Sequence, residues 1–280
     1  MKVFFGNMAT VLAVLVVGCV LITGALYVFQ RRLLYFPDTS VPDLAGSGLV
    51  GVEEVWLETD DGGHLLSWYS DPGPGMPTVL YFHGNAGHIG YRVEKIRPFL
   101  DAGYGVLLAG YRGYGGNPGT PSEQGLFADA RAAVNFLKRR GLSVANLVVY
   151  GESLGSAVAT RMAAELATQT AEGGGAVMAL ILEAPFTSAA EAASHFFSAI
   201  PVKWLLRDRF DSGSIIGQVG TPVFILHGDS DRIMPIHFGK KLYGLASSPK
   251  DCLWVAGAGH NDLFEHGAAK AVLEFIARQR

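Results

Sequence analysis

The chain has few charged side chains and almost no cysteine. Only 17% of its 280 residues are charged, and its two cysteines, Cys19 and Cys252, stand far apart in different contexts. A disulfide or a cysteine metal site is therefore not expected, and no cofactor is predicted. The net charge of -3 comes with no basic stripe, which argues against nucleic acid as a partner. Because 49% of the residues are hydrophobic, we expect a large buried core and little disorder.

Charge is completely missing from residues 3–29, and apolar side chains dominate residues 9–29. As a helix this apolar stretch would span roughly 30 Å, the thickness of the hydrocarbon core of a bilayer. Interfacial aromatic residues and two cations, Arg31 and Arg32, follow it. We predict that residues 1–36 are a membrane anchor with its juxtamembrane segment, and that the single-pass transmembrane helix within them stays attached. A chain without them should then remain active on a small soluble ester.

Two other interpretations of this stretch are weaker. A cleaved signal peptide is disfavoured because the apolar run is longer than usual and no A-x-A site ends it. Lipidation of Cys19 is disfavoured because the chain stays apolar beyond that residue. The alanine- and glycine-rich composition suggests a bacterial source, and with the apolar helix we expect location in a bacterial inner membrane. Lys2 and the amino terminus balance Arg31 and Arg32, so the side of the catalytic domain is not determined.

In the rest of the chain, predicted strands alternate with helical patterns, as expected for one α/β domain. Residues 37–52, rich in Pro, Gly, Asp and Ser, are predicted to be a linker, and residues 53–280 the catalytic domain. Apolar or alternating runs predict strands at residues 53–59, 64–70, 78–82, 105–109, 147–150, 178–183, 222–226 and 252–255. Because helical patterns separate most of these runs, we expect a mostly parallel sheet with helices on both faces.

Residues 187–217 are too long for a simple connection between two strands. We interpret them as a small helical cap insertion that emerges at the carboxyl edge of the sheet. Its apolar side chains either line a groove for an acyl chain or only fix the cap to the sheet; they are Phe196, Phe197, Ile200, Trp204 and Leu205.

The pattern Gly151-x-Ser153-x-Gly155 lies between a predicted buried strand and a predicted helix. This placement is typical of a nucleophile elbow, in which small residues allow a sharp strand-to-helix turn that exposes the serine. The alternative is a helix start that happens to contain a serine. We predict that Ser153 is a catalytic nucleophile.

A serine nucleophile needs a base and an orienting acid, and two downstream loops supply candidates. Residues 227–232 follow one predicted strand and contain Asp229 and Asp231, whereas His260 follows the last strand. The order Ser153, Asp231, His260 is that of α/β-hydrolases. Asp229 remains a rival for the acid, although the residue nearer the strand often caps the turn that follows it instead.

The developing oxyanion needs backbone donors. We predict that the Leu154 amide, directly after the nucleophile, supplies one of them. The loop after the strand at 78–82 supplies the other, with the Asn85 amide as first choice and Ala86 as second. A glycine-rich tight turn is the alternative for this loop, and it is compatible with the role. His83 and His227 are interpreted as structural histidines.

Taken together, five motifs resemble the Bem46-type branch of the α/β-hydrolase superfamily, whose membrane-tethered serine hydrolases are related to ABHD proteins. The motifs are His83-Gly84-Asn85-Ala86-Gly87, Tyr111-Arg112-Gly113-Tyr114-Gly115, Gly151-Glu152-Ser153-Leu154-Gly155, His227-Gly228-Asp229-Ser230-Asp231 and Gly259-His260-Asn261-Asp262. The resemblance covers the chain from about Leu33 to its end. It implies the eight-stranded α/β-hydrolase fold and a Ser153–His260–Asp231 triad, and it favours Asp231 over Asp229.

The sequence thus predicts a membrane-anchored serine hydrolase that cleaves carboxylic esters or thioesters through an acyl-enzyme. Its expected partners are an acyl substrate and the lipid bilayer. A serine peptidase or amidase with the same triad is one alternative. A non-catalytic binding protein with this fold is the other, and the presence of Ser153, Asp231 and His260 argues against it. The natural substrate, the acyl-chain length and the oligomeric state are not determined.

Overall fold

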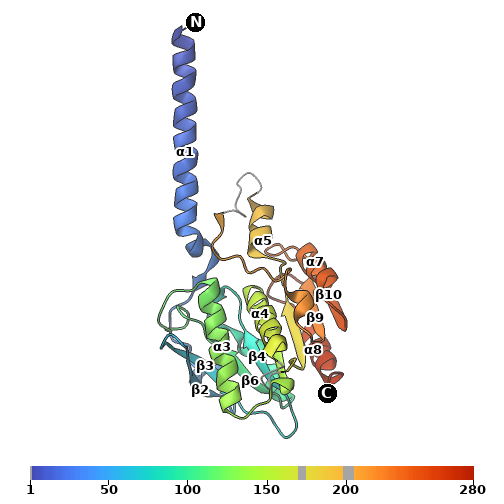
Figure 1. The fold of residues 1–280 in the computed structure, drawn as a ribbon. Helices are drawn as coiled ribbons and strands as arrows, with labels where there is room; N and C mark the ends of the chain where they lie inside the picture. Colours follow the sequence, from blue (N-terminus) through green and yellow to red (C-terminus); the bar gives the residue numbers. More distant parts are fainter. Residues whose placement is uncertain (1, 170–174, 198–204) are drawn as a thin grey trace.

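The computed structural model describes residues 2–169, 175–197 and 205–280, with side chains from residue 10 onward (Figure 1). A long helix, α1 (Lys2–Leu34), projects from a body in which helices flank a central sheet. Within the described ranges the sheet has eight strands: β2 (Glu53–Glu58), β3 (His64–Ser70), β4 (Thr78–Phe82), β6 (Gly105–Ala109), β7 (Leu147–Glu152), β8 (Ala179–Glu183), β9 (Val223–Gly228) and β10 (Lys250–Val255).

The strands lie in the order β10-β9-β8-β7-β4-β6-β3-β2. The pairs β2–β3 and β3–β6 are antiparallel, and all other neighbours in this sheet are parallel. The carboxyl ends of β4, β7, β8, β9 and β10 therefore meet at one edge, which is where loops in this type of sheet carry binding and catalytic residues. The predicted α/β-hydrolase fold is confirmed.

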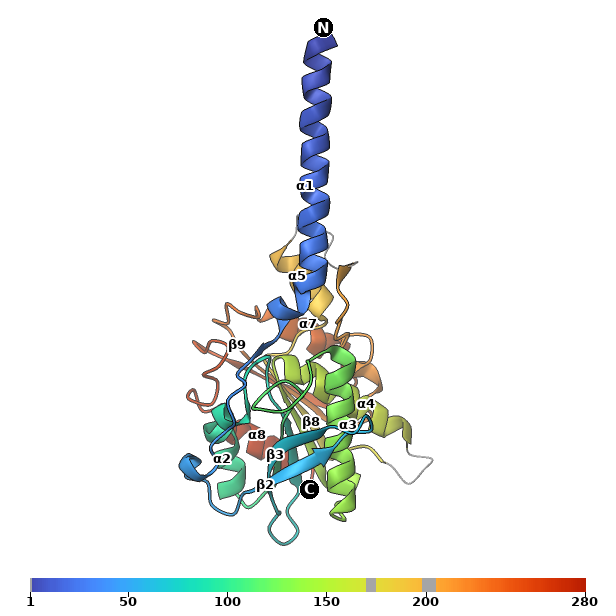
Figure 2. The same cartoon turned by 90° about the vertical axis from the view of Figure 1, so that its left-hand side faces the viewer.

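Side chains alternate between two hydrophobic clusters, one on each face of the sheet. In β7, Leu147 and Val149 contact one cluster, whereas Val148 and Tyr150 contact the other. The first face is covered by α3 (Glu123–Arg139), α4 (Leu154–Thr168) and α7 (His237–Leu245), and the second by α2 (Val93–Asp101) and α8 (Ala268–Ala277) (Figure 2). Strands buried on both faces explain why the central runs are continuously apolar in sequence.

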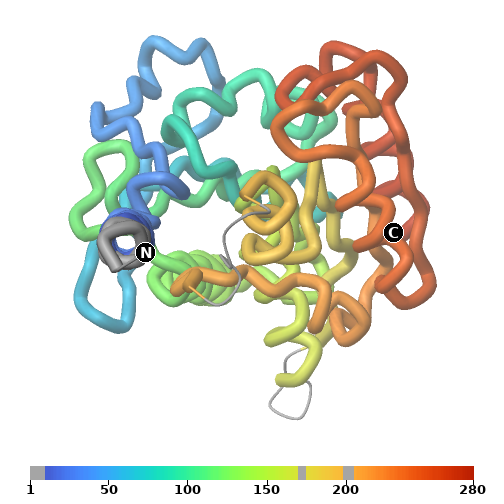
Figure 3. The backbone as a smooth tube through the Cα atoms, turned by 90° about the horizontal axis from the view of Figure 1, so that it is seen from above, coloured from blue at the N-terminus to red at the C-terminus, as the bar shows by residue number. Residues whose placement is uncertain are grey.

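Helix α1 extends away from the body in both side views and is seen end-on at one side of the domain in Figure 3. By length and composition, Thr10–Leu34 is able to cross a membrane: its mean hydropathy is 2.7 and none of the scored window is buried in the protein. Arg31 and Arg32 lie in its last turn.

The chain that leaves α1 lies directly on the domain. Tyr35 is buried, and β1 (Phe36–Pro37) forms a parallel pair with β5 (Ala86–Gly87), which follows β4. We call residues 30–38 the exit segment. Beyond it, the predicted linker also packs against the body, since Pro42 is buried and Leu49 contacts the core.

The described helical part of the cap insertion is α5 (Ala189–Phe196), which follows the carboxyl end of β8. Phe196 and Phe197 are half exposed, at 49% and 55%. Leu205 is partly buried. Ile200 and Trp204, which the sequence places among the apolar cap residues, lie outside the described residues.

Candidate active site

The turn between β7 and α4 holds Ser153 in a strained conformation, with φ 51° and ψ -114°. Such a backbone costs about 1–3 kcal/mol and persists only where its surroundings fix it. Here the Ser153 amide donates to the carbonyl of Glu183 at 2.8 Å. The flanking glycines are required, since a Cβ at Gly151 would lie 2.3 Å from the oxygen of Gly155, and one at Gly155 would lie 2.1 Å from the oxygen of Phe82.

The structure brings the three side chains of the predicted triad together. Oγ of Ser153 lies 3.0 Å from Nε2 of His260, and Nδ1 of His260 lies 2.7 Å from Oδ2 of Asp231. Asp231 comes from the loop after β9 and His260 from the loop after β10. In this arrangement His260 can donate from Nδ1 to the carboxylate and accept the serine proton at Nε2.

Asp231 is buried, and both of its carboxylate oxygens face donors. Oδ1 accepts the amides of Ile233 and Met234, each at 2.8 Å. Oδ2 lies 2.7 Å from His260 and 3.2 Å from Nε2 of His227. Burial raises the pKa of Asp231, but the hydrogen bonds from His227 and His260 outweigh it and hold the pKa below its usual value. The carboxylate therefore stays ionised beside His260.

Asp229 has a different position. Its Oδ1 accepts the Gly257 amide at 2.8 Å and the Ser230 hydroxyl at 3.1 Å. The bond from Gly257 connects the loops after β9 and β10. Of the two acids that the sequence offers, it is Asp231 that contacts His260.

The predicted oxyanion donors flank the nucleophile. Leu154 is the first residue of α4, where a helix provides no acceptor for its own amide. On the other side, a Cβ on Gly84 would lie 3.5 Å from the Cβ of Ser153, so the loop of residues 83–87 passes close to the serine. The Asn85 amide has no acceptor among the described residues.

Buried His83 orients the peptide between Gly84 and Asn85. Its Nδ1 lies 2.8 Å from the Gly84 oxygen, and the amide of Asn85 points the opposite way because the peptide is planar and trans. Burial, aided by the Arg92 guanidinium, lowers the pKa of His83 to about 3, so its ring stays neutral. The second-choice donor, Ala86, lies in β5, next to Phe36 of the exit segment.

Two buried carboxylates lie beneath the elbow, and sequence analysis assigned them no partners. Glu152 accepts two hydrogen bonds from Arg92, at 2.9 and 3.1 Å, and one from Tyr81 at 2.9 Å. Burial raises the pKa of Glu152, but Arg92 dominates and lowers it. Glu183 contacts Lys95 and the Tyr150 hydroxyl. These pairs fix the end of β7, from which the elbow begins, and the end of β8, whose Glu183 carbonyl accepts the Ser153 amide.

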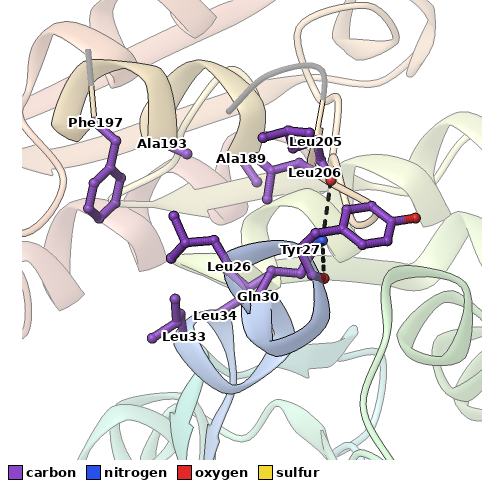
Figure 4. A pocket seen from close by; sticks show the side chains of 10 residues that line it. All are labelled: Leu26, Tyr27, Gln30, Leu33, Leu34, Ala189, Ala193, Phe197, Leu205 and Leu206. Carbon is purple, nitrogen blue, oxygen red and sulfur yellow. Dashed lines mark hydrogen bonds between the residues drawn. The ribbon is translucent and has the colours of Figure 1, made fainter. Parts of the chain in front are cut away.

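An apolar cavity of about 150 Å³ lies between the end of α1 and the cap insertion (Figure 4). Its apolar lining consists of Leu26, Leu33, Leu34, Ala189, Ala193, Phe197, Leu205 and Leu206. At its rim Gln30 donates to the Leu205 carbonyl at 3.2 Å. Two of the cap residues singled out in the sequence, Phe197 and Leu205, thus contribute to a cavity whose other side is the apolar helix.

Metal-ligating side chains do not gather in the described part of the chain: no group of three or more His, Cys, Asp or Glu could hold an ion there.

Comparison with known proteins identifies the family. Residues 75–215 match the family model described as serine aminopeptidase, S33. The uncharacterized protein Rv2307c of Mycobacterium tuberculosis is 41% identical over 236 residues, covering 83% of this chain and 81% of that protein. The chain belongs to the α/β-hydrolase superfamily.

Other α/β-hydrolases extend the comparison. Lysophosphatidylserine lipase ABHD12 of Danio rerio is 33% identical, over 78% of this chain and 64% of that protein. Among solved structures, the esterase Pf2001 of Pyrococcus furiosus covers 88% of this chain and 98% of its own, with a TM-score of 0.66 and 21% identity. An α/β-hydrolase from Vibrio vulnificus covers 81% and 82%, with a TM-score of 0.63 and 26% identity.

Proposed function

We propose that this α/β-hydrolase is a membrane-anchored serine hydrolase that cleaves carboxylic esters or thioesters of acyl chains. The observation that carries the proposal is the continuous contact from Ser153 through His260 to Asp231, with distances of 3.0 and 2.7 Å. The strained elbow supports it, because strain of this kind is maintained where exposure of a reactive side chain requires it.

Acylation follows from the geometry. Nε2 of His260 accepts the proton of Ser153 as Oγ attacks the carbonyl carbon of the substrate. The ionised Asp231 stabilises the imidazolium that forms. Negative charge develops on the carbonyl oxygen, where the amides of Leu154 and Asn85 donate to it. His260 then gives its proton to the leaving alcohol or thiol as the bond to the acyl carbon breaks.

Deacylation reverses these roles. A water molecule attacks the acyl-serine ester while His260 accepts its proton, and the same two amides stabilise the second tetrahedral intermediate. Release of the carboxylic acid returns the proton from His260 to Ser153. The cycle consumes one water and needs no other reactant.

Anchoring in a membrane is supported by α1. A signal sequence at an N-terminus can have the same length and hydropathy as an anchor helix, so the contacts of the helix end carry the argument. The last turn of α1 is bonded to the domain, however: Arg31 contacts Asp208 through two hydrogen bonds of 2.8 and 3.0 Å. Cleavage beyond Arg31 would remove these bonds, so they agree with an anchor whose end stays part of the folded protein.

The cavity between α1 and the cap supports an acyl chain as the apolar part of the substrate. Its lining is almost entirely aliphatic or aromatic, and its α1 side continues into the helix that would lie in the bilayer. Each methylene buried there would contribute up to about 0.8 kcal/mol. One relative is named as a lipase and one structural neighbour as an esterase, and both names are consistent with an acyl ester as substrate.

A serine aminopeptidase is the second candidate, because the matching family model has that description. Binding the α-ammonium of a peptide requires an available carboxylate near the nucleophile. Glu152 and Glu183, the carboxylates beneath the elbow, are instead occupied by Arg92 and Lys95. This occupation makes ester cleavage the better supported activity.

Labelling with a fluorophosphonate tests the proposal, with p-nitrophenyl acetate hydrolysis measured in parallel. We expect one adduct, on Ser153, and a loss of about 10⁶ in kcat for Ser153→Ala. Ser143→Ala is the matched control, since the Ser143 hydroxyl makes no capping bond and lies at the far end of β7. An adduct on a different serine, or turnover retained by Ser153→Ala, would contradict the assignment. Hydrolysis of aminoacyl amides in preference to esters would favour the peptidase.

A further inference from the structure

We propose that the exit segment, residues 30–38, is a positioning element of the active site: it holds the Asn85 amide in place as an oxyanion donor. The inference rests on the proposed function and adds to it a role for the end of the membrane helix in catalysis. It replaces our expectation that residues 1–36 serve only as an anchor.

Two hydrogen bonds connect the exit segment directly to Asn85. The Asn85 side-chain Nδ2 donates to the carbonyl of Leu34 at 2.8 Å. The backbone amide of Phe36 donates to the carbonyl of Asn85 at 2.9 Å. Leu34 is the last residue of α1, so the end of the helix is hydrogen-bonded directly to the residue that carries the candidate oxyanion donor.

The surrounding contacts complete this attachment. The Asn85 carbonyl also accepts the Tyr114 hydroxyl at 2.8 Å, so both of its lone pairs are used. Further along, the Asp38 amide donates to the Gly87 carbonyl at 3.1 Å. The Asp38 carbonyl accepts the Gly115 amide at 2.7 Å. Other segments of the chain therefore hold the Asn85 side chain and its carbonyl. They also hold the strand β5 that follows Asn85.

Contacts from outside the loop matter because His83 contacts only one of its peptides, at the Gly84 oxygen, and two glycines leave the rest of the loop backbone free to move. Gly84 and Gly87 lie on either side of Asn85, and Gly87 has a φ of 76°. Glycine gives the backbone a wide range of alternative conformations. A displacement of about 1 Å at a reacting group can cost about a hundredfold in rate. Loss of the hydrogen bonds that restrict the loop should therefore lower kcat.

The other end of the exit segment is fixed to the cap insertion. Arg31 and the Tyr35 hydroxyl both donate to the buried carboxylate of Asp208. Gln30 accepts the amide of Arg207 at 2.7 Å. The segment is thus held independently of the 83–87 loop, which allows it to act as a rigid support for that loop.

The test uses full-length protein in detergent micelles and measures kcat and KM for p-nitrophenyl acetate. Active sites are titrated with a fluorophosphonate, so that only folded enzyme is counted. Asn85→Ala removes the bond to Leu34 but keeps the backbone amide. We expect kcat per titrated site to fall by about tenfold or more, with KM changed by less than about twofold, because the lost interaction acts on the transition state.

Two further variants separate positioning from loss of a side chain. Phe36→Pro removes the amide that donates to Asn85, whereas Phe36→Ala removes only the half-exposed ring. The proline variant should lose at least about tenfold more kcat than the alanine variant. Asn146→Ala, at an exposed position before β7, should behave like the wild type.

The outcomes are distinguishable. If wild-type protein is labelled on Ser153 but Asn85→Ala and Phe36→Pro both keep kcat within about twofold, the inference is wrong and the proposed function stands. If wild-type protein is not labelled on Ser153, the proposed function fails and the inference fails with it. A selective fall in kcat in both variants supports the inference.

Discussion

Replacing Asp231 by asparagine exchanges one carboxylate oxygen for an NH₂ group at almost constant size. The amides of Ile233 and Met234 require an oxygen at the Oδ1 position, where each donates at 2.8 Å. The asparagine must therefore turn its NH₂ group toward Nδ1 of His260, which lies 2.7 Å from Oδ2 in the native protein. Nδ1 becomes an acceptor, the ring proton moves to Nε2, and His260 can no longer accept the proton of Ser153.

The size of the effect identifies its cause. Loss of one charge-assisted hydrogen bond costs about 1.5–3 kcal/mol, which corresponds to roughly 10- to 150-fold in rate. Trapping the wrong histidine tautomer costs about 10⁴ in kcat, or about 5.4 kcal/mol at the transition state. Because the Ile233 and Met234 amides allow the asparagine side chain only one orientation, we expect the larger loss in kcat, about 10⁴.

The assay is kcat for p-nitrophenyl acetate per titrated active site, compared between Asp231→Asn and Asp229→Asn. Asp229 is a suitable control because its carboxylate bonds to Gly257 and Ser230 instead of His260. We expect Asp229→Asn to remain within about tenfold of the wild type. A loss below about a hundredfold in Asp231→Asn, or a greater loss in Asp229→Asn, would refute the reasoning.

Three further predictions concern the elbow, the 83–87 loop and the cap. Gly155→Ala should destabilise the protein by more than about 4 kcal/mol in denaturant unfolding, since its Cβ would lie 2.1 Å from the Phe82 oxygen. Gly244→Ala, with nothing within 4 Å, should not, and equal stability of the two variants would exclude the steric argument. The pKa of His83 is lowered from 6.5 to about 3, so only the unfolded chain binds its proton at mild acidity. Unfolding free energy should therefore fall by about 2 kcal/mol more in the wild type than in His83→Gln between about pH 7 and pH 5, and parallel slopes would contradict this. For p-nitrophenyl esters, kcat/KM should rise from acetate to about octanoate, and Phe197→Ala should flatten that rise; a decline from acetate onward would mean that the cavity takes no acyl chain.

The fold could be predicted because its signals are local. Continuous apolar runs place β4, β6, β7 and β8 to within a residue or two, and their alternation with helical patterns gives a parallel sheet. The last helix is the exception: the helical pattern of the sequence begins near Asp262, but α8 begins at Ala268. Gly267 before it has a φ of 83°, and the Asp262 carboxylate is used by the Gly259 amide, so a turn replaces the first helical residues.

The site could be predicted only in part. The elbow serine and the loop histidine have sequence signatures, but Asp229 and Asp231 lie on one loop, and only the path of the backbone shows which of them faces His260. The catalytic roles of all these residues stay predictions until they are measured.

Contacts between distant short segments could not be predicted at all. The pair β1–β5 joins two residues to two others about fifty positions away, which is too short to leave a periodic pattern. The composition of residues 37–52, rich in Pro and Gly, predicts a linker and gives no sign of their contacts with the body. Likewise, nothing in the sequence indicates that Arg92 is the partner of Glu152, because the two meet only when α2 covers the sheet.

Direct attachment of α1 to the domain would also set the height of Ser153 above the bilayer, if α1 spans the membrane as proposed. Leu34 ends the apolar helix, and the next residue, Tyr35, is already buried in the domain. With α1 in the bilayer as proposed, no flexible tether lets the domain drift or tumble at the surface. The depth at which an ester group sits in the leaflet then becomes a selection criterion of its own. Lipids whose scissile bond lies near the headgroups would reach Ser153 with their chains still in the membrane, whereas deeper esters would have to be lifted out.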